Sequence, residues 1–285
     1  ATTSDGKVDM EAARREARLR KQAGVTQGPL LSTGGFSVPS YLGSKKSDDE
    51  KKALLQATIE SAATLADEFD WADSYIYGID EASGDVLRSE IPVIKLAGSM
   101  GGKVAAAVLQ DFKDVAFTVM HIPIYSGIPD PEVVETVHKI GHKIMRYGSP
   151  QGGAENPWLW RYRYGLMLWE IGLDGGCTWA WRGATANIWD DFDGGTYYRD
   201  CVMTYPGANG PIDTVQWVGY REAQDDLRYM GTLQTALEKA RKRGDRTKVV
   251  NEVDTWLARR SQFPFENDNL DRVRAQMIQY IIALD

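Results

Sequence analysis

Hydrophobic and polar positions follow two periods along residues 1–200, one typical of amphipathic helices and one typical of buried strands. Helices are predicted at residues 8–23, 47–69, 84–97, 130–143 and 157–172. Short apolar strands are predicted at residues 25–32, 74–79, 103–108, 115–121, 143–147 and 176–181. Strands that alternate with helices form parallel βα units, which favours an α/β protein of the (β/α)8 TIM-barrel type. Ser47 and Glu50 have the spacing of a capping box at the start of the second helix.

About six βα units fit into residues 1–200, whereas a complete barrel has eight. The chain opens on a helix, where a complete barrel would open on a strand. We therefore expect residues 1–200 to form a barrel catalytic domain whose first two units precede residue 1. An additional chain segment or an oligomer partner would complete this barrel, because open sheet edges need to be covered.

The pattern changes after residue 200, and residues 201–285 are predicted to form a hairpin and helices packed on the barrel. Strands at 201–205 and 214–217 are joined through Asn209-Gly210, a pair typical of tight hairpin turns. Helices follow at residues 219–243, 246–260 and 268–283.

Two adjacent carboxylates, Asp80 and Glu81, follow the apolar strand at 74–79. Acidic residues at the carboxyl end of a barrel strand lie where active sites of this architecture are built. Adjacent strand residues point to opposite faces, so both acids serve one pocket only if the chain bends, which Ser83-Gly84 would allow. The alternative is that one of the acids only caps the following helix.

Composition limits what the chain binds. The net charge of −7 argues against a nucleic-acid partner, because phosphate contacts need clustered Lys and Arg. No apolar run is long enough to span a membrane, so no membrane partner is expected.

Cys177 and Cys201 are too few for a Cys-rich zinc site, although one disulfide between them is compatible with the sequence. His138 and His142 lack a third ligand, so no metal site is expected, and the pair is expected to be exposed.

Three segments carry a family resemblance: the Asp-Glu pair after YIYGI, NPWLWRYRYGLMLWEIGLDGGCTWAW at 156–181, and MTYPGANGPIDTVQWVGYREAQDDLRYMGTL at 203–233. The last is the most specific, because its order of Tyr-Pro-Gly, Gly-Pro, Arg and Asp-Asp is unusual. Together they resemble the C-terminal two-thirds of bacterial TIM-barrel glycosidases related to glycoside hydrolase family 123, which include β-N-acetylgalactosaminidases. The chain departs from the family in having Ala82 where Pro is common, and in lacking a glycine in the helix after Tyr220.

The resemblance implies a hydrolase that cleaves β-linked N-acetylhexosamine, with N-acetylgalactosamine as the expected sugar, and takes part in polysaccharide degradation without a cofactor. Asp80 would orient the 2-acetamido group of the substrate, whose oxygen attacks the anomeric carbon. Glu81 would protonate the leaving oxygen and later activate water, as in substrate-assisted retaining hydrolysis. A secreted or periplasmic location is what the resemblance suggests.

Aromatic residues are candidate sugar contacts, and 9 Trp with 13 Tyr suit either sugar stacking or a large core. Tyr147 ends a predicted strand and would donate a hydrogen bond to the acetamido carbonyl. Trp179 and Trp181 share a face of the last predicted strand, where Trp181 would form a floor for the sugar or both would pack in the core. His121, at the end of the 115–121 strand, would bind a sugar hydroxyl. Tyr77, deeper on its strand, is expected to pack.

Two candidates lie further along the chain. Arg161 matches an arginine typical of the family and is expected to pair with an acid near the substrate, and Trp189 would edge the pocket. The loop around Trp189 holds three acids that form either a weak calcium-loop pattern or a polar turn: Asp190, Asp191 and Asp193.

Three functions compete on these residues. The first is the substrate-assisted hydrolase, favoured by the Asp80–Glu81 pair. The second is a glycan-binding or structural relative without turnover, favoured by Ala82 and the missing βα units. The third is a two-carboxylate glycosidase for a neutral sugar, whose second acid lies elsewhere; the separation of the carboxyl groups would distinguish it.

Overall fold

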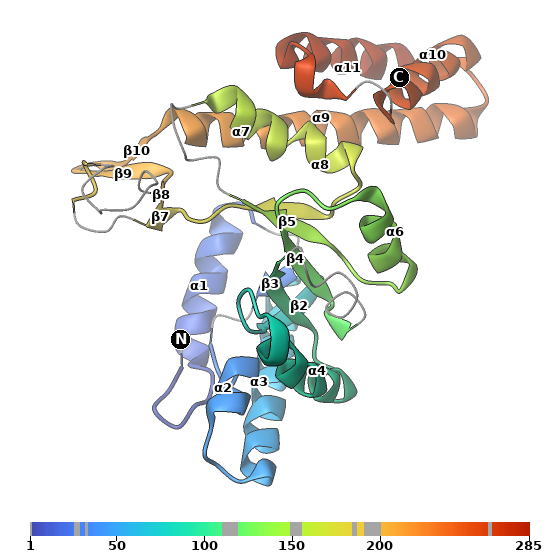
Figure 1. Cartoon of the computed structure of the whole chain (residues 1–285). Coiled ribbons are helices and arrows are strands. Elements are labelled where there is room, and N and C mark those ends of the chain that lie inside the picture. The colour runs from blue at the N-terminus through green and yellow to red at the C-terminus, as the bar shows by residue number, and fades with distance from the viewer. Residues whose placement is uncertain are drawn as a thin grey trace. The chain divides into compact units, whose positions relative to one another are not determined.

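A computed structural model describes most of the chain, in eight stretches: residues 2–25, 29–31, 34–109, 119–148, 156–183, 187–190, 201–261 and 264–285. The chain divides into two compact units, Ala1–Arg146 (unit 1) and Tyr147–Asp285 (unit 2). The boundary predicted at residue 200 marks a change of sequence pattern and stays a prediction. Each unit is described by itself, with the labels of Figure 1.

Unit 1 is built on a curled parallel sheet, a half-barrel of five strands that pair in chain order. Figure 1 labels four of them, β2 to β5. The strands are β1 Pro29–Leu31, β2 Asp73–Tyr77, β3 Val104–Val108, β4 Ile122–Ser126 and β5 Met145–Tyr147. All residues of β3 are buried, as expected for a central parallel strand covered on both faces. The α/β class with a parallel sheet is therefore confirmed.

The helices of unit 1 flank this sheet: α1 Met10–Gln22, α2 Val38–Gly43, α3 Asp48–Glu68, α4 Gly84–Ser99 and α6 Pro131–Lys139. The capping box predicted at Ser47 and Glu50 is formed, with both reciprocal hydrogen bonds present. Helix α2 was not predicted, because six residues are too few to show a helical period.

One predicted strand of unit 1 is contradicted in its described part, because residues 119–121 are not in a strand. The strand expected at 115–121 lies partly outside the described residues, and β4 begins only at Ile122. The segment Ile122–Ser126 contains Pro123, which argues against a central strand in a sequence. Pro123 is nevertheless in register with Ala106 of β3, and burial of its apolar neighbours outweighs the lost amide donor.

Unit 2 is mainly helical, with short β-elements. Its helices are α7 Pro157–Arg163, α8 Leu166–Glu170, α9 Val215–Arg243, α10 Thr247–Ala258 and α11 Leu270–Leu284, with short 3-10 turns at Arg259–Ser261 and Phe265–Asn267. The single helix expected at 157–172 is broken before Gly165. A Cβ at Gly165 would lie 2.4 Å from the Arg161 carbonyl oxygen and 3.1 Å from Ala223 Cα, so only glycine fits against α9.

The strands of unit 2 are β6 Gly175–Cys177, β7 Arg182–Gly183, β8 Cys201–Val202, β9 Thr204–Gly207 and β10 Gly210–Asp213. The predicted hairpin exists, but β9 pairs with β10 and not with residues 214–217. Those residues begin α9, because the Thr214 hydroxyl accepts a hydrogen bond from the Trp217 amide (3.2 Å) and caps the helix. The β-branched and aromatic character of the segment had favoured a strand.

The three long C-terminal helices of unit 2 share one apolar core. Its most buried members come from α9, α10, α11 and the turn before α11: Leu233, Val253, Phe265, Met277 and Leu284. No helix in the described part of the chain is long and apolar enough to cross a membrane.

Candidate functional site

The Asp80–Glu81 pair lies in the connection between β2 and α4, which we call the acid turn (residues 78–83). The amides of Ile76, Gly78 and Glu81 donate in succession to the carbonyls of Lys103, Ala105 and Ala107, at 2.9, 2.9 and 3.0 Å. The acid turn therefore follows the carboxyl end of β2 and runs beside the end of β3. This is the edge of the sheet at which the sequence predicts the two acids to act.

A one-residue insertion brings the two acids together. Regular parallel pairing advances two residues on each strand, but from Gly78 to Glu81 it advances three on β2 while β3 advances two. The extra residue behaves as a bulge, a device that re-aims side chains next to functional sites. Glu81 takes up the bend with a φ of 49°, in the left-handed region that non-glycine residues rarely adopt.

The bend therefore begins at Glu81, two residues before the expected Ser83-Gly84, where Gly84 also has a positive φ of 52°. The N-cap of α4 is Ser83, so neither acid caps that helix. Both acid side chains are exposed. A left-handed glutamate costs on the order of 1–2 kcal/mol and persists only where its surroundings fix it, as at ligand-binding sites.

Tyr77 orients Asp80. The Tyr77 hydroxyl donates to Asp80 Oδ1 (2.9 Å) and accepts a hydrogen bond from the Ala107 amide (3.2 Å). The sequence predicted only packing for Tyr77. Its polar role depends on the chain turning back after Ile79, which no sequence pattern reveals.

Glu90 holds the acid turn from behind. It lies on α4, is fully buried, and accepts the Ile79 amide at Oε2 (2.9 Å). Its Oε1 makes no hydrogen bond within the described part of the chain. Burial raises the pKa of Glu90, and the Ile79 amide offsets this only in part. Sequence reasoning missed Glu90, although an acid in the apolar helical series with Leu87 and Ile94 was a usable signal.

A buried cation also lies at this edge of the sheet. Arg146 of β5 is almost fully buried, and its Nε donates to the carbonyl of Gly127 (2.8 Å), directly after β4. It joins the ends of two neighbouring strands, a role that sequence reasoning did not assign. Arginine is mostly exposed in proteins, so the sequence gives no indication that Arg146 is buried at the end of its strand.

His121 lies elsewhere. It precedes β4 and so occupies the amino edge of the sheet, opposite the acid turn, which corrects the expected strand-end position. Its Nδ1 accepts the Val104 amide (3.1 Å), and its ring packs on His142, with centroids 4.9 Å apart. Burial first, then His142 and Lys103, lower the pKa of His121 to about 4. His142 is thus half-buried and not exposed as expected.

In unit 2, Tyr147 ends β5 as predicted. Its hydroxyl is buried and has no hydrogen-bond partner among the described residues. A buried hydroxyl normally finds a partner, and the role of Tyr147 as a donor to the acetamido carbonyl stays a prediction.

Three tryptophans predicted to contact sugar are exposed in unit 2: Trp179 by 68 %, Trp181 by 49 % and Trp189 by 58 %. Strand β6 ends at Cys177, so Trp179 and Trp181 follow the strand and do not belong to it as expected. Trp181 meets Trp217 edge-on (4.6 Å between centroids). Trp189 stacks on Tyr205 (5.0 Å, 11° between planes). Their exposure speaks against the core-packing alternative.

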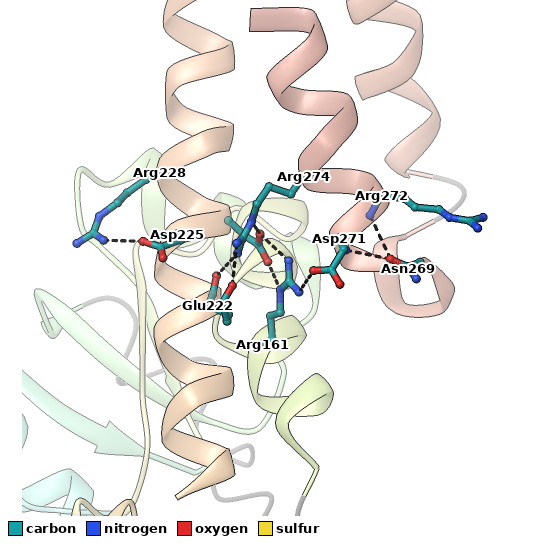
Figure 2. Close-up of polar contacts among 9 residues, drawn as sticks. Arg161, Glu222, Asp225, Arg228, Asn269, Asp271, Arg272 and Arg274 are labelled. Carbon is teal, nitrogen blue, oxygen red and sulfur yellow. Dashed lines mark hydrogen bonds and ion pairs between the residues drawn. The ribbon is translucent and has the colours of Figure 1, made fainter. Parts of the chain in front are cut away.

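Arg161 belongs to a partly buried ion network that joins α7, α9 and α11 (Figure 2). Its Nε and a terminal nitrogen donate to the two Asp226 oxygens (2.6 and 3.1 Å), and its other terminal nitrogen donates to Asp271 (2.6 Å). Asp226 is fully buried and also accepts from Arg274 Nε (2.6 Å). Arg161 therefore pairs with acids within the helical packing of unit 2, and an acid partner near the substrate stays a prediction.

The remaining candidates offer little chemistry. Cys177 is a free thiol whose pKa is raised by burial, and the side chain of Cys201 lies outside the described residues. Asp190 is exposed, whereas Asp191 and Asp193 fall outside the described residues. Within the described part of the chain, no group of three or more His, Cys, Asp or Glu side chains is arranged to hold a metal ion.

Comparison of the sequence with protein-family models gave no match, and comparison with curated proteins gave none either. The likeness to family 123 glycosidases therefore stays an expectation that rests on the segments quoted above.

Proposed function

We propose that this chain is a glycoside hydrolase that cleaves β-linked N-acetylhexosamine, with N-acetylgalactosamine as the expected sugar, by a substrate-assisted retaining mechanism. The observation that carries the proposal is the acid turn. Two consecutive carboxylates are exposed together at the carboxyl edge of a parallel sheet. Glu81 adopts a strained backbone conformation there, and Tyr77 fixes the Asp80 carboxylate.

In the first step of the proposed reaction, Asp80 accepts a hydrogen bond from the substrate N–H and steers the acetamido oxygen onto the anomeric carbon. A C–O bond forms at that carbon as the glycosidic C–O bond breaks. The Glu81 proton passes to the departing oxygen, and the negative charge of Asp80 stabilises the oxazolinium that results. A bound sugar would cover Glu81, which is open to solvent without it.

In the second step, water adds to the anomeric carbon on the face left by the aglycone, and Glu81 takes the proton of that water. The oxazoline C–O bond breaks, its electron pair returns to the acetamido oxygen, and the β-configuration is retained. The substrate, water and Glu81 supply all the protons and electrons of the two steps, so the proposed reaction uses no cofactor.

The finer fold assignment belongs to the same proposal. The curled half-barrel of unit 1 would be part of a (β/α)8 barrel. A further chain segment or an oligomer partner would cover the open sheet edge. The carbohydrate substrate is the partner that the acid turn would recognise.

The test is hydrolysis of aryl β-N-acetylgalactosaminide and β-N-acetylglucosaminide by the wild type and the Asp80→Asn and Glu81→Gln variants. Each substitution should lower kcat/KM by roughly 10²–10⁴-fold, the usual share of a general acid or base. Asp85→Asn is the matched control, because Asp85 is an exposed carboxylate of the same region that pairs only with Arg88 among the contacts described. Full activity of both acid variants would overturn the proposal.

A second candidate function is glycan binding without turnover. The exposure of Trp179, Trp181 and Trp189 in unit 2 favours it, since exposed indole rings stack on sugar faces. Binding of N-acetylhexosamine oligosaccharides that Trp181→Ala and Trp189→Ala weaken, with no hydrolysis by the wild type, would support this candidate over the first.

A further inference from the structure

We infer that Glu90 is a positioning residue for the acid turn: its buried carboxyl group binds the Ile79 amide and holds the one-residue bulge that presents Asp80 and Glu81 together. The inference rests on the proposed function for its effect on catalysis, and on the geometry alone for its effect on the turn.

The first argument is the place of the hydrogen bond. The amides of Gly78 and Glu81 on either side continue the ladder to β3, but the Ile79 amide donates to Glu90 Oε2 at 2.9 Å. The Glu90 side chain of α4 thus accepts the hydrogen bond of the Ile79 amide at the point where the strand pairing shifts by one residue. Without it, a half-buried amide would be left unsatisfied inside the turn.

The second argument is close approach. A Cβ at Gly78 would lie 3.3 Å from Glu90 Oε2 and 3.0 Å from the Ala106 Cβ, and Gly78 is buried. The carboxyl group of α4 therefore lies directly against the backbone of the turn. A methyl group at position 78 would require Ala106 of β3 or the Glu90 carboxyl group to shift by a few tenths of an ångström.

The third argument is the cost of the carboxyl group. Glu90 is fully buried on the apolar face of α4, with Leu87 and Ile94 as buried neighbours along the helix. Within the described residues one oxygen of this buried acid has no hydrogen bond, and such an acid lowers stability relative to an apolar side chain of similar size. Its one described hydrogen bond is to the Ile79 amide in the acid turn. Glu90 therefore stabilises the conformation of the turn and does not stabilise the core.

Substitutions of Glu90 should therefore affect activity and stability differently, and three variants test this. Glu90→Met removes the hydrogen bond and fills the core position with an apolar chain. Glu90→Gln keeps an oxygen that accepts the Ile79 amide. Ile94→Ala on the same helix is the control that weakens the core and leaves the acid turn untouched.

Three readouts are measured: amide hydrogen exchange at Ile79, steady-state hydrolysis of the aryl N-acetylhexosaminides, and the melting temperature. Glu90→Met should speed exchange at Ile79 on the order of tenfold, the worth of one hydrogen bond. It should lower kcat on the order of 100-fold, as small displacements of reacting groups do, with KM nearly unchanged. The melting temperature should change little, because the apolar side chain in the core offsets the unsatisfied Ile79 amide. Glu90→Gln should keep the wild-type exchange rate at Ile79 and the wild-type kcat. Ile94→Ala should lower the melting temperature and keep the wild-type kcat.

Unchanged exchange at Ile79 in Glu90→Met would overturn the inference, and so would equal kcat losses in Glu90→Met and Ile94→Ala. Absence of hydrolysis by the wild type would contradict the proposed function instead. In that case the exchange of Ile79 still decides whether Glu90 holds the turn.

Discussion

The acid turn of unit 1 and the ion network of unit 2 use charge in opposite ways. In unit 2, Asp226 is fully buried and two arginines supply its hydrogen bonds, so the charges satisfy one another inside the helical packing (Figure 2). In unit 1, Asp80 and Glu81 are exposed, on a backbone that is bent and held from behind. A dense charge cluster alone therefore does not mark a binding site; exposed charge on a constrained backbone is the stronger indication.

The largest expected effect is on unit 2. Asp226→Ala would leave Arg161 and Arg274 without their shared buried partner, so the free energy of unfolding should fall by about 3–5 kcal/mol. Chemical denaturation followed by circular dichroism measures this. The neighbouring Asp225→Ala is the control, because its pair with Arg228 is exposed and worth at most about 1 kcal/mol. If the two variants lose equal free energy of unfolding, the Asp226 network is not the structural element that this comparison with the acid turn assumes.

Next in size is Tyr77→Phe. It removes a hydrogen bond to the Asp80 carboxylate and keeps the ring, so kcat/KM should fall about 10–100-fold, as expected for a hydrogen bond to a charged group. The measurement is steady-state hydrolysis of the aryl substrates. Tyr75→Phe on the same strand is the control. If the two phenylalanine variants lose activity equally, Tyr77 does not orient Asp80.

A pH dependence should appear at the amino edge of the unit 1 sheet. The pKa of His121 is lowered to about 4 in the folded chain, from an ordinary value of 6.5, by burial, His142 and Lys103. The unfolded chain then binds more protons below pH 6.5, so the stabilising effect of neutral His121 is complete above pH 6.5 and is lost as the pH falls toward 4.

His121→Asn should flatten this slope, since its amide oxygen still accepts the Val104 amide and does not titrate. Burial lowers the pKa of His142 as well, so a smaller slope should remain. Melting temperatures between pH 7 and pH 4 measure the effect. An unchanged slope in His121→Asn would mean that other groups control the acid sensitivity.

The smallest effect concerns backbone strain. Glu81→Gly should raise the free energy of unfolding by up to about 1 kcal/mol, because glycine adopts the left-handed conformation of position 81 without steric cost. The same variant should be inactive. Glu81→Gln, which keeps the strain, should also lose activity, by roughly 10²–10⁴-fold, but should be no more stable than wild type. Equal stability of the two variants would remove the evidence for strain at the acid turn.

Much of the secondary structure was predictable, because local signals agreed with the packing. The capping box at Ser47 and Glu50 set the start of α3, and helical periodicity located α9, α10 and α11. Two strand predictions are contradicted in their described parts, each where one residue opposes the local pattern. Pro123 hides the central strand β4, and Thr214 turns a strand-like segment into a helix start.

For the site, the sequence indicated the acid pair and its sheet edge, but not the residues that hold it. Tyr77 and Glu90 act on the acid turn only because the pairing of β2 slips by one residue at Gly78–Glu81. A register slip arises from tertiary packing and leaves no periodic signal in the sequence. His121 was misplaced for the related reason that its strand was misplaced.

The most direct test of the central claim is the dependence of the hydrolysis rate on the nucleophilicity of the substrate's own acyl oxygen. Aryl β-N-acetylhexosaminides are compared with their N-fluoroacetyl and N-trifluoroacetyl analogues under identical conditions. Participation of the acyl oxygen in the reaction beside Asp80 and Glu81 predicts that kcat/KM falls steeply with each added fluorine, and that Asp80→Asn flattens this fall. Turnover that is insensitive to fluorination, or equally rapid cleavage of neutral aryl glycosides, would contradict the claim.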